Sequence, residues 1–438
     1  MSERTLDHHP KRFAMTNELH ARPFMPVAAP GRALVMAFKQ TNNAQERDPA
    51  LDRRHLLAFI DRHGGQHPAP GASHYLATFG RFTMKWERHT EFVSYTLVEE
   101  GGGEALFDSA LAEHLPPDWL AEAPGQVVAA SEIEVLRVAD RAAAEKALTG
   151  PLSREFSAES LAAALTLDDG ALAIGDFRIH EGGFSRFALV VYGPVGDRRI
   201  GRAMQRLVEI ENYRMLAMLA LPIARDAAAR LNEIDRELSR LIATVADRED
   251  PREEAEILDA LTALSAEIEA MSATTAFRFG AARAYEAIVH ERIAMMREER
   301  MIGRQLFSEF MLRRFDPAMR TVRATSGRLT DLATRAGRIA DLLRTRVDVA
   351  LQAQNQQLLT SMDKRAALQL RLQQTVEGLS VVAISYYAVS LAGYFIAPLG
   401  QVFGVTKEGL TALTAIPIVA AVALFVRRIR RGVEKAER

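Results

Sequence analysis

The sequence contains no cysteine, and this absence removes several kinds of chemistry. Disulfide bonds, thiolate metal sites and cysteine nucleophiles are all excluded. The chain also lacks a phosphate-binding P-loop, the G-x-S-x-G pattern of serine hydrolases and the H-E-x-x-H pattern of zinc proteases. We therefore predict no catalytic residue and no cofactor, and the sequence favours a role other than that of an enzyme.

Excess charge of either sign is also missing. The formal net charge is -1 over 438 residues, so the composition gives no reason to expect nucleic acid as a partner. The chain opens with MSERTLDHHPKRF, which lacks the apolar core of a secretory signal. We therefore expect the large N-terminal part to stay in the cytoplasm.

Long apolar runs are confined to the C-terminal end. Residues 379–399 carry no charge, and a second stretch over about 404–426 is uncharged from Leu410 onward. At about 1.5 Å per residue, a helix of about 20 residues crosses a hydrocarbon core of roughly 30 Å. We predict a transmembrane hairpin over 379–426, followed by a basic tail at 427–438, with the lipid bilayer as a partner.

The positive charges flanking the two predicted spans predict their orientation. Short segments rich in Arg and Lys stay on the cytoplasmic side of a membrane. Such residues precede the first span and follow the second, whereas the connecting loop holds only Lys407, beside Glu408. Both ends of the chain are therefore expected in the cytoplasm.

Residues 1–195 mix strand and helix signals. Apolar and polar residues alternate in several short runs, as they do in half-buried strands, and helical spacing appears at 51–63. A hairpin is predicted over 170–179 and 184–192, because glycines lie between these two runs. The other predicted strands are 33–40, 75–83, 91–98 and 133–138. Together these signals predict an α+β domain with a mainly antiparallel sheet.

Residues 196–378 change to long helices. Apolar residues step by three and four along 231–245 and again along 257–271, which is typical of a helical hairpin or a coiled coil. We expect a further helix over about 275–314. This region forms the predicted coiled-coil and stalk domain.

Two Asp-Pro pairs mark the starts of helices in this region. Asp250 with Pro251, and Asp316 with Pro317, each supply an N-cap and a proline at the first helical position. From Pro317 the helical pattern continues to the first apolar run. We therefore predict a stalk helix of about 60 residues before the membrane.

The predicted stalk carries polar residues on an apolar seam. A heptad count from Leu351 to Leu379 places Asn355, Arg365 and Gln369 at seam positions. Polar seam residues fix register and oligomer number at a cost in stability, so they predict self-association. The alternative is that they form polar rings around a water-filled axis. Ten basic against four acidic residues over 320–376 also suit contact with anionic lipid.

The first predicted span has its own polar face. Tyr387, Ser390 and Tyr394 share one side of a helix, Glu377 lies at the entry and Gln401 near the exit. Hydroxyl and small residues favour close packing of membrane helices, including self-association. The alternative is a pore face, with an ion or proton role for Glu377.

Two features of the N-terminal domain leave alternatives open. Nine of the eleven histidines lie within the first 114 residues, and they form either a metal site with Glu18 or Glu91 or a scattered set of hydrogen-bonding side chains. In the segment ELHARPF, Glu18, His20 and Arg22 are candidate contacts for a partner or an anion. The same residues could instead fix the N-terminus onto the domain.

Three segments carry a resemblance to a known family. They read ELHARPF at 18–24, LLRTRVDVALQAQNQQLL at 342–359 and LRLQQTVEGLSVVAISYY at 370–387. They resemble segments of a bacterial family of uncharacterised membrane-anchored proteins, whose domain of unknown function spans nearly the whole chain. The resemblance implies a place in the bacterial inner membrane and supplies no catalytic residue.

The predicted order of elements resembles, more loosely, the CorA class of magnesium channels. That class carries a Gly-Met-Asn signature at the end of its first span, whereas this chain has Ala-Pro-Leu-Gly-Gln at 397–401. Likeness of architecture does not establish function. It implies a homo-oligomeric ion channel or transporter as an alternative.

Three functions follow from the sequence. The first is a cytoplasmic scaffold or sensor that is tethered by the C-terminal hairpin. The second is the CorA-like channel or transporter, for which a ring of stalks would supply the axis. The third, a metal-dependent enzyme, requires the N-terminal histidines to converge and ranks behind the other two.

Overall fold

The computed structural model describes residues 7–13, 15–16, 24–40, 47–103, 105–108, 110–247, 251–403 and 407–436. The chain divides into two compact units. Unit 1 comprises Met1–Asp247 and Asp259–Ala340, and unit 2 comprises Arg248–Leu258 and Asp341–Arg438. The predicted domain boundaries at 195, 378 and 426 stay predictions.

Unit 1 is built on a mixed sheet that is mostly antiparallel, as predicted. Its nine described strands follow the order β2-β3-β4-β1-β5-β8-β7-β6-β9, and only the β5–β8 pair is parallel. The strands are β1 (Gly31–Lys39), β2 (His74–Phe79), β3 (Phe82–Arg88), β4 (Phe92–Glu100), β5 (Gln126–Arg137), β6 (Ala162–Thr166), β7 (Ala171–Ile179), β8 (Ser185–Val191) and β9 (Glu299–Arg300).

The predicted β7–β8 hairpin is confirmed, whereas two other expectations differ from the structure. The run 75–83 is a hairpin and not one strand, because the chain turns at Gly80, whose φ of 58° is readily adopted by glycine. Strand β6 was not predicted. Its sequence, AAALT, has no β-branched residue before the final Thr, so it lacks the usual strand signal.

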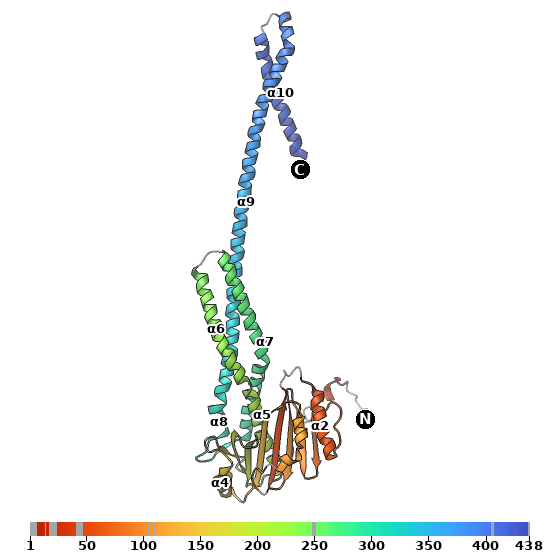
Figure 1. The fold of residues 1–438 in the computed structure, drawn as a ribbon, viewed down its shortest axis with the longest axis vertical. Coiled ribbons are helices and arrows are strands. Elements are labelled where there is room, and N and C mark those ends of the chain that lie inside the picture. Colours follow the sequence, from red (N-terminus) through yellow and green to blue (C-terminus); the bar gives the residue numbers. More distant parts are fainter. Residues whose placement is uncertain are drawn as a thin grey trace. The chain divides into compact units, whose positions relative to one another are not determined.

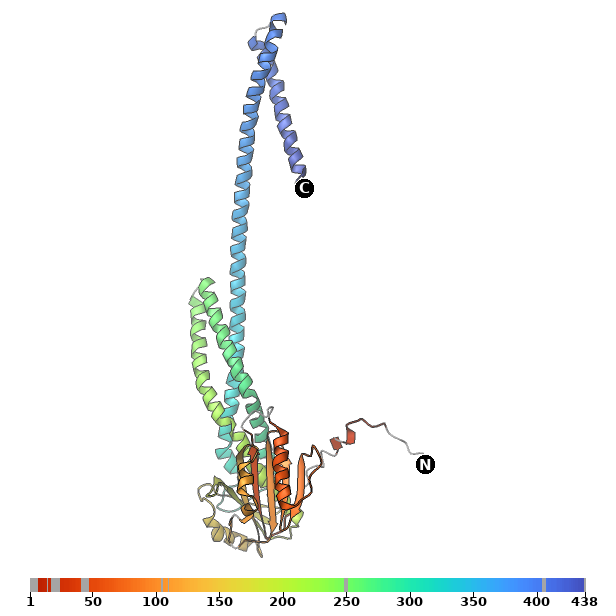
Figure 2. The same cartoon turned by 45° about the vertical axis from the view of Figure 1, so that its right-hand side comes forward.

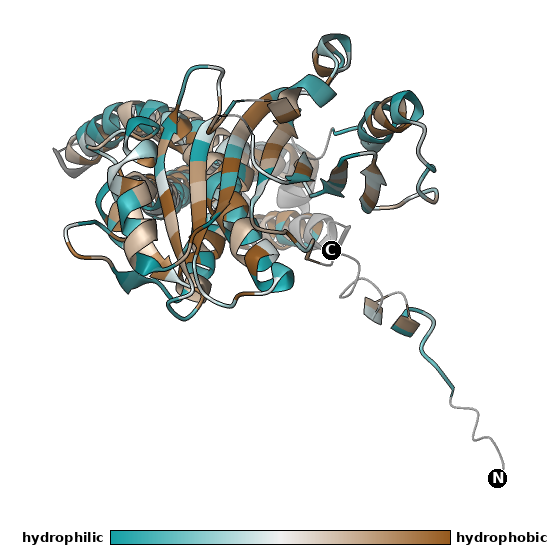
Figure 3. Cartoon of the chain, turned by 90° about the horizontal axis from the view of Figure 1, so that it is seen from below, coloured by the Kyte–Doolittle hydropathy of each residue, from teal (hydrophilic) through white to brown (hydrophobic). Residues whose placement is uncertain are grey.

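Short helices cover one face of the sheet. They are α2 (Pro49–His63), η2 (Ala110–His114), α3 (Pro117–Ala121), α4 (Arg141–Thr149) and η3 (Pro151–Arg154). Helix α2 stands against the strands (Figure 2), and its buried Leu56, Phe59 and Ile60 pack with Leu34 and Trp86 from the sheet. Figure 3 shows hydrophobic residues gathered on the strands. Alternate strand residues therefore form this core.

Long helices form the rest of unit 1. Helix α5 (Asp197–Met218) lies on the other face of the sheet, where Leu216 packs with Ala37, Phe92 and Ala129. Helices α6 (Ala220–Asp247) and α7 (Pro251–Met296) run side by side (Figure 1). Six of the predicted seam residues in unit 1 are buried, namely Leu231, Ile234, Leu238, Leu261, Leu264 and Ile268, whereas Leu241 and Met271 are half-buried. This supports the helical pairing, while coiled-coil geometry stays a prediction.

The predicted helix over 275–314 is wrong in its bounds. Helix α7 continues without a break through Thr275, whose hydroxyl donates to the Met271 carbonyl at 2.8 Å within the helix. The chain then leaves the helix after Met296, adds β9 to the sheet and starts α8 (Phe307–Arg314). The predicted helical segments at 257–271 and from about 275 onward therefore belong to one helix, α7.

Two apolar helices close the chain. Helix α9 (Asp316–Phe403) is continuous over 88 residues and begins at the predicted Asp-Pro pair. Helix α10 (Lys407–Ala436) follows. Both are long and apolar enough to cross a membrane, with windows of mean hydropathy 1.7 and 1.9. These helices point to a membrane association, while the transmembrane hairpin itself stays a prediction.

Candidate functional site

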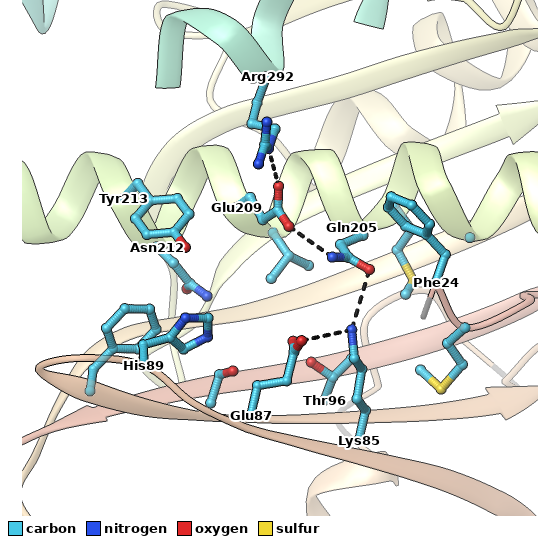
Figure 4. Close-up of a pocket in the computed structure, with 16 residues that line it drawn as sticks. Phe24, Lys85, Glu87, His89, Thr96, Gln205, Glu209, Asn212, Tyr213 and Arg292 are labelled. Atoms are coloured by element: carbon cyan, nitrogen blue, oxygen red, sulfur yellow. Dashed lines mark hydrogen bonds and ion pairs between the residues drawn. The ribbon is translucent and has the colours of Figure 1, made fainter. Parts of the chain in front are cut away.

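A hollow lined by many polar side chains lies between the sheet and α5. This hollow, here called the α5 cavity, has a volume of about 270 Å³. Its floor comes from β3 and β4, one wall from α5, and Arg292 reaches it from α7 (Figure 4). This volume lies just below the usual range for ligand pockets, which is about 300–1,000 Å³.

Strand alternation explains why the floor is polar. Met84 and Trp86 point into the core beneath α2, so their neighbours Lys85 and Glu87 point to the α5 side. Strand β4 repeats this pattern: it sends Tyr95 toward α2 and its neighbouring Ser and Thr residues toward the cavity. Two adjacent strands therefore present polar groups on the face that α5 covers.

A chain of hydrogen bonds and ion pairs crosses the cavity. Arg292 pairs with Glu209, and the Gln205 amide donates to Glu209 Oε1 at 2.8 Å. Lys85 Nζ lies 3.4 Å from Gln205 Oε1 and 3.0 Å from Glu87 Oε1 (Figure 4). The two cationic and two anionic side chains balance, so the cavity fits an uncharged or zwitterionic ligand better than an ion.

Aromatic rings close one end of the cavity. The His89 ring stacks on Phe92 with centroids 4.1 Å apart, and Tyr213 meets Phe92 edge-on at 6.1 Å. Behind them, Tyr213 stacks on Tyr285 of α7 at 5.4 Å. Flat ring faces beside the polar network give the cavity an apolar side as well as a polar one.

A buried charge cluster next to this end holds α7 against the sheet. The Glu91 carboxylate is almost fully buried and pairs with Arg278, and Tyr285 donates to it at 2.6 Å. Burial and this hydrogen bond both raise the pKa of Tyr285. Glu91, weighed above as a metal ligand, therefore has a structural ion pair with a residue 187 positions away.

The histidines that the structure describes near the N-terminus do not form a group of three potential metal ligands, although His63 and His114 lie close to each other. His55 is buried, stacks on Trp119 at 4.0 Å and lies 2.8 Å from the Tyr95 hydroxyl and 2.9 Å from the Trp119 carbonyl. His67 pairs with Asp61 at 2.6 Å, after Gly64 has ended α2. Among the described residues, the one group of three potential metal ligands lies elsewhere and contains none of these side chains.

Burial sets the charge of two acid–base groups in the sheet domain. It lowers the pKa of His55 to about 4, so this ring is neutral at pH 7. Its Nε2–H can then donate to the Trp119 carbonyl while Nδ1 accepts from Tyr95. Burial also raises the pKa of Glu134 to about 7, although the Phe107 amide donates to that carboxylate at 3.0 Å.

The predicted N-terminal contacts Glu18, His20 and Arg22 lie outside the described residues. The described chain resumes at Phe24, which lines the α5 cavity. The anion or partner role of the preceding segment stays a prediction.

The predicted stalk seam lies on an exposed part of α9. Asn355, Arg365 and Gln369 are exposed, and so is every residue from 351 to 376. The apolar seam positions share this exposure, for example Leu358 at 55% and Met362 at 63%. The helix was predicted correctly, whereas the role of its seam is untested by the single chain.

The predicted polar face of the first span is exposed as well. Tyr387 and Tyr394 are 73% and 74% exposed, and Ser390 is also exposed, whereas Glu377 is half-buried. The buried positions of this stretch include Ser385, which the sequence analysis did not single out. Gln401 lies within α9, and its side chain is outside the described part.

The α5 cavity itself was missed by the sequence analysis. Its charged residues come from positions 85, 87, 209 and 292, which no local pattern connects. One signal was available in the sequence. Lys85 and Glu87 place two charges on one face of β3, whereas the other face of this strand is apolar.

Comparison with known proteins gives a family without an activity. No curated protein matches the chain. A family model matches residues 7–433, nearly the full length, which confirms the expected membership of an uncharacterised family. The chain belongs to the family described as "Protein of unknown function (DUF3422)".

Proposed function

We propose that this chain is a membrane-anchored cytoplasmic sensor or scaffold that self-associates through α9. The observation that carries the proposal is the exposed apolar seam of α9, which continues along the same helix into the apolar stretch at 379–399.

Self-association follows from the spacing of the exposed side chains. Leu351, Leu358, Met362, Leu372 and Val376 lie at seam positions, and each is more than half exposed. Each such side chain contributes roughly 1.5–3 kcal/mol when it is fully buried. A second copy of the same helix buries all of them at once, since heptad positions a and d meet across a coiled coil. Asn355 then fixes the register of the pairing.

The membrane anchor rests on α9 and α10 together. Their apolar windows have the length and hydropathy of membrane spans, and the arginines at the end of the second window and after it favour a cytoplasmic C-terminus. The sheet domain then lies in the cytoplasm. We assign ligand binding by the sensor to the α5 cavity, whose balanced charges suit a small zwitterionic or uncharged molecule.

A matched pair of variants tests the seam. Leu358→Glu places a charge at a seam position, whereas Leu370→Glu places the same charge at an off-seam position whose side chain is equally exposed, at 56% against 55%. In sedimentation of the full-length protein in detergent, we expect Leu358→Glu to weaken association at least about tenfold, which is a change of roughly 1.4 kcal/mol. We expect Leu370→Glu to leave it unchanged. Equal effects of the two variants on association would reject the proposal that the chain self-associates through the seam.

An ion channel is the second candidate, and one observation favours it. Helix α9 is uninterrupted from the polar seam residues Asn355, Arg365 and Gln369 into the apolar stretch, as a pore-lining helix requires. Flux across liposomes that contain the purified protein separates the two functions. The sensor predicts no flux under any ion gradient, and the channel predicts flux that Leu358→Glu abolishes together with the oligomer.

A further inference from the structure

Three potential metal ligands meet where α9 begins. Glu286 and His290 are four residues apart on α7, so they share one face of that helix. Asp316 is the first residue of α9. One ligand atom of each of these three side chains lies within 4.8 Å of the other two. In the part of the chain that the structure describes, no other set of three His, Asp or Glu residues has this spacing.

One distance within this group is close to that between two ligands of one ion. His290 Nε2 lies 3.2 Å from Asp316 Oδ1. Zinc bonds of about 2.0–2.2 Å at tetrahedral angles place neighbouring ligand atoms roughly 3.3–3.6 Å apart. Asp316 Oδ1 is buried and has no hydrogen-bond partner, so its pairing with His290 lacks the alignment of a hydrogen bond. A buried carboxylate oxygen without a donor is costly, and a cation would remove that cost.

The surroundings allow an ion to enter. The His290 side chain is 45% exposed, which leaves one side of the group open to water. Glu286 pairs with Arg323 of α9, and this guanidinium competes with a metal for the carboxylate. Because the Arg323 side chain is 44% exposed, it can turn into solvent when a cation takes its place.

We propose that Glu286, His290 and Asp316 bind one divalent transition-metal ion, with zinc as the best fit. One imidazole nitrogen and two carboxylate oxygens suit zinc or iron, whereas magnesium and calcium prefer oxygen ligands alone. Three protein ligands leave at least one position for water. The ion joins α7 to the first turn of α9. This site does not depend on the membrane anchor or on the seam.

Metal binding to the full-length protein in detergent tests the site directly. After treatment with a chelator, the protein is titrated with Zn²⁺ by calorimetry, and the bound metal is counted by mass spectrometry. We expect one tightly bound ion per chain and no displacement by an equal concentration of Mg²⁺. Loss of an outer-shell partner of a metal ligand weakens metal binding roughly 10–100-fold. His290→Ala and Asp316→Asn each change a direct ligand, so each should weaken Zn²⁺ binding by more than this.

Two further variants separate this site from other histidines. His67→Ala removes a histidine that also pairs with an aspartate but belongs to no group of three, and we expect it to leave Zn²⁺ affinity unchanged. Arg323→Gln removes the competing cation, so it should increase the affinity, an effect that a purely structural ion pair would not produce. Co²⁺ in place of Zn²⁺ should give a visible absorption band that His290→Ala abolishes. Absence of a tight site in the wild-type chain, or equal binding by His290→Ala, would overturn the proposal.

Discussion

The neutral histidine on the buried face of α2, His55, makes a prediction about acid stability. His55 is buried among aromatic rings and has both ring nitrogens within hydrogen-bond distance of a partner. Burial lowers its pKa from 6.5 to about 4, because the charged ring has no water around it. Protonation would also turn Nδ1 from an acceptor into a donor. The native domain therefore resists protonation that the unfolded chain accepts.

The sign of the effect follows from this difference. Between pH 6.5 and pH 4 the unfolded state binds a proton at His55 and the native state does not, so stability falls as the pH falls. Each pH unit in this window corresponds to about 1.4 kcal/mol. The contribution of His55 to the free energy of unfolding should thus decrease by about 2 kcal/mol between pH 7 and pH 5 and by about 3 kcal/mol down to pH 4.

Tryptophan fluorescence measures this domain selectively. The chain has two tryptophans, Trp86 and Trp119, and both belong to the core that contains α2. The test compares the free energy of unfolding by urea of the full-length wild type with that of His55→Gln across this pH range. Glu134 titrates in the opposite direction, since its pKa is raised to about 7, but it is present in both proteins and cancels in the difference.

The variant should be less stable at pH 7, and its deficit relative to the wild type should shrink by about 2 kcal/mol at pH 5. A deficit that is the same at both pH values would refute the assignment of a depressed pKa to His55.

Two further predictions concern the packing around the α5 cavity. Glu91→Gln leaves Arg278 buried without its counter-charge and should cost about 3–5 kcal/mol, measured by urea unfolding, whereas an effect below about 1 kcal/mol would contradict a structural ion pair. Gly201→Ala should cost about 1–3 kcal/mol, because the added Cβ would overlap the Met25 carbonyl oxygen. The matched change Gly280→Ala, where a Cβ meets open space, should be neutral or stabilise by up to about 1 kcal/mol, and equal effects at the two glycines would argue against the close contact.

Periodic patterns account for the parts of the fold that the sequence predicted. The long helices were predictable because apolar residues recur every three or four positions over many turns. Asp316 with Pro317 gave the start of α9 to within one residue, since the helix begins at the predicted N-cap Asp316 and not at Pro317. Helix α2 and strand β4 were found in the same way, through helical spacing and alternation, and the β7–β8 hairpin was found through the glycines between its strands. Strand β6 was missed because its pairing with β7 and β9, and not its alanines, makes it a strand.

The candidate sites depend on contacts that no local pattern records. Lys85, Glu209 and Arg292 meet only because α5 and α7 cover the same part of the sheet. The pair Glu286 and His290 was visible as a four-residue spacing on a helix, yet its third member becomes a neighbour only through the return of the chain at α9. By contrast, the clustering of histidines near the N-terminus suggested a shared metal site, and the described histidines of that region form no group of three ligands.

The central claim is that the apolar stretches of α9 and α10 lie in a bilayer, and alkaline carbonate extraction of cell membranes tests it most directly. The full-length chain should remain in the membrane pellet, and a variant that ends after residue 378 should be released into the supernatant. Release of the full-length chain by carbonate would contradict the claim.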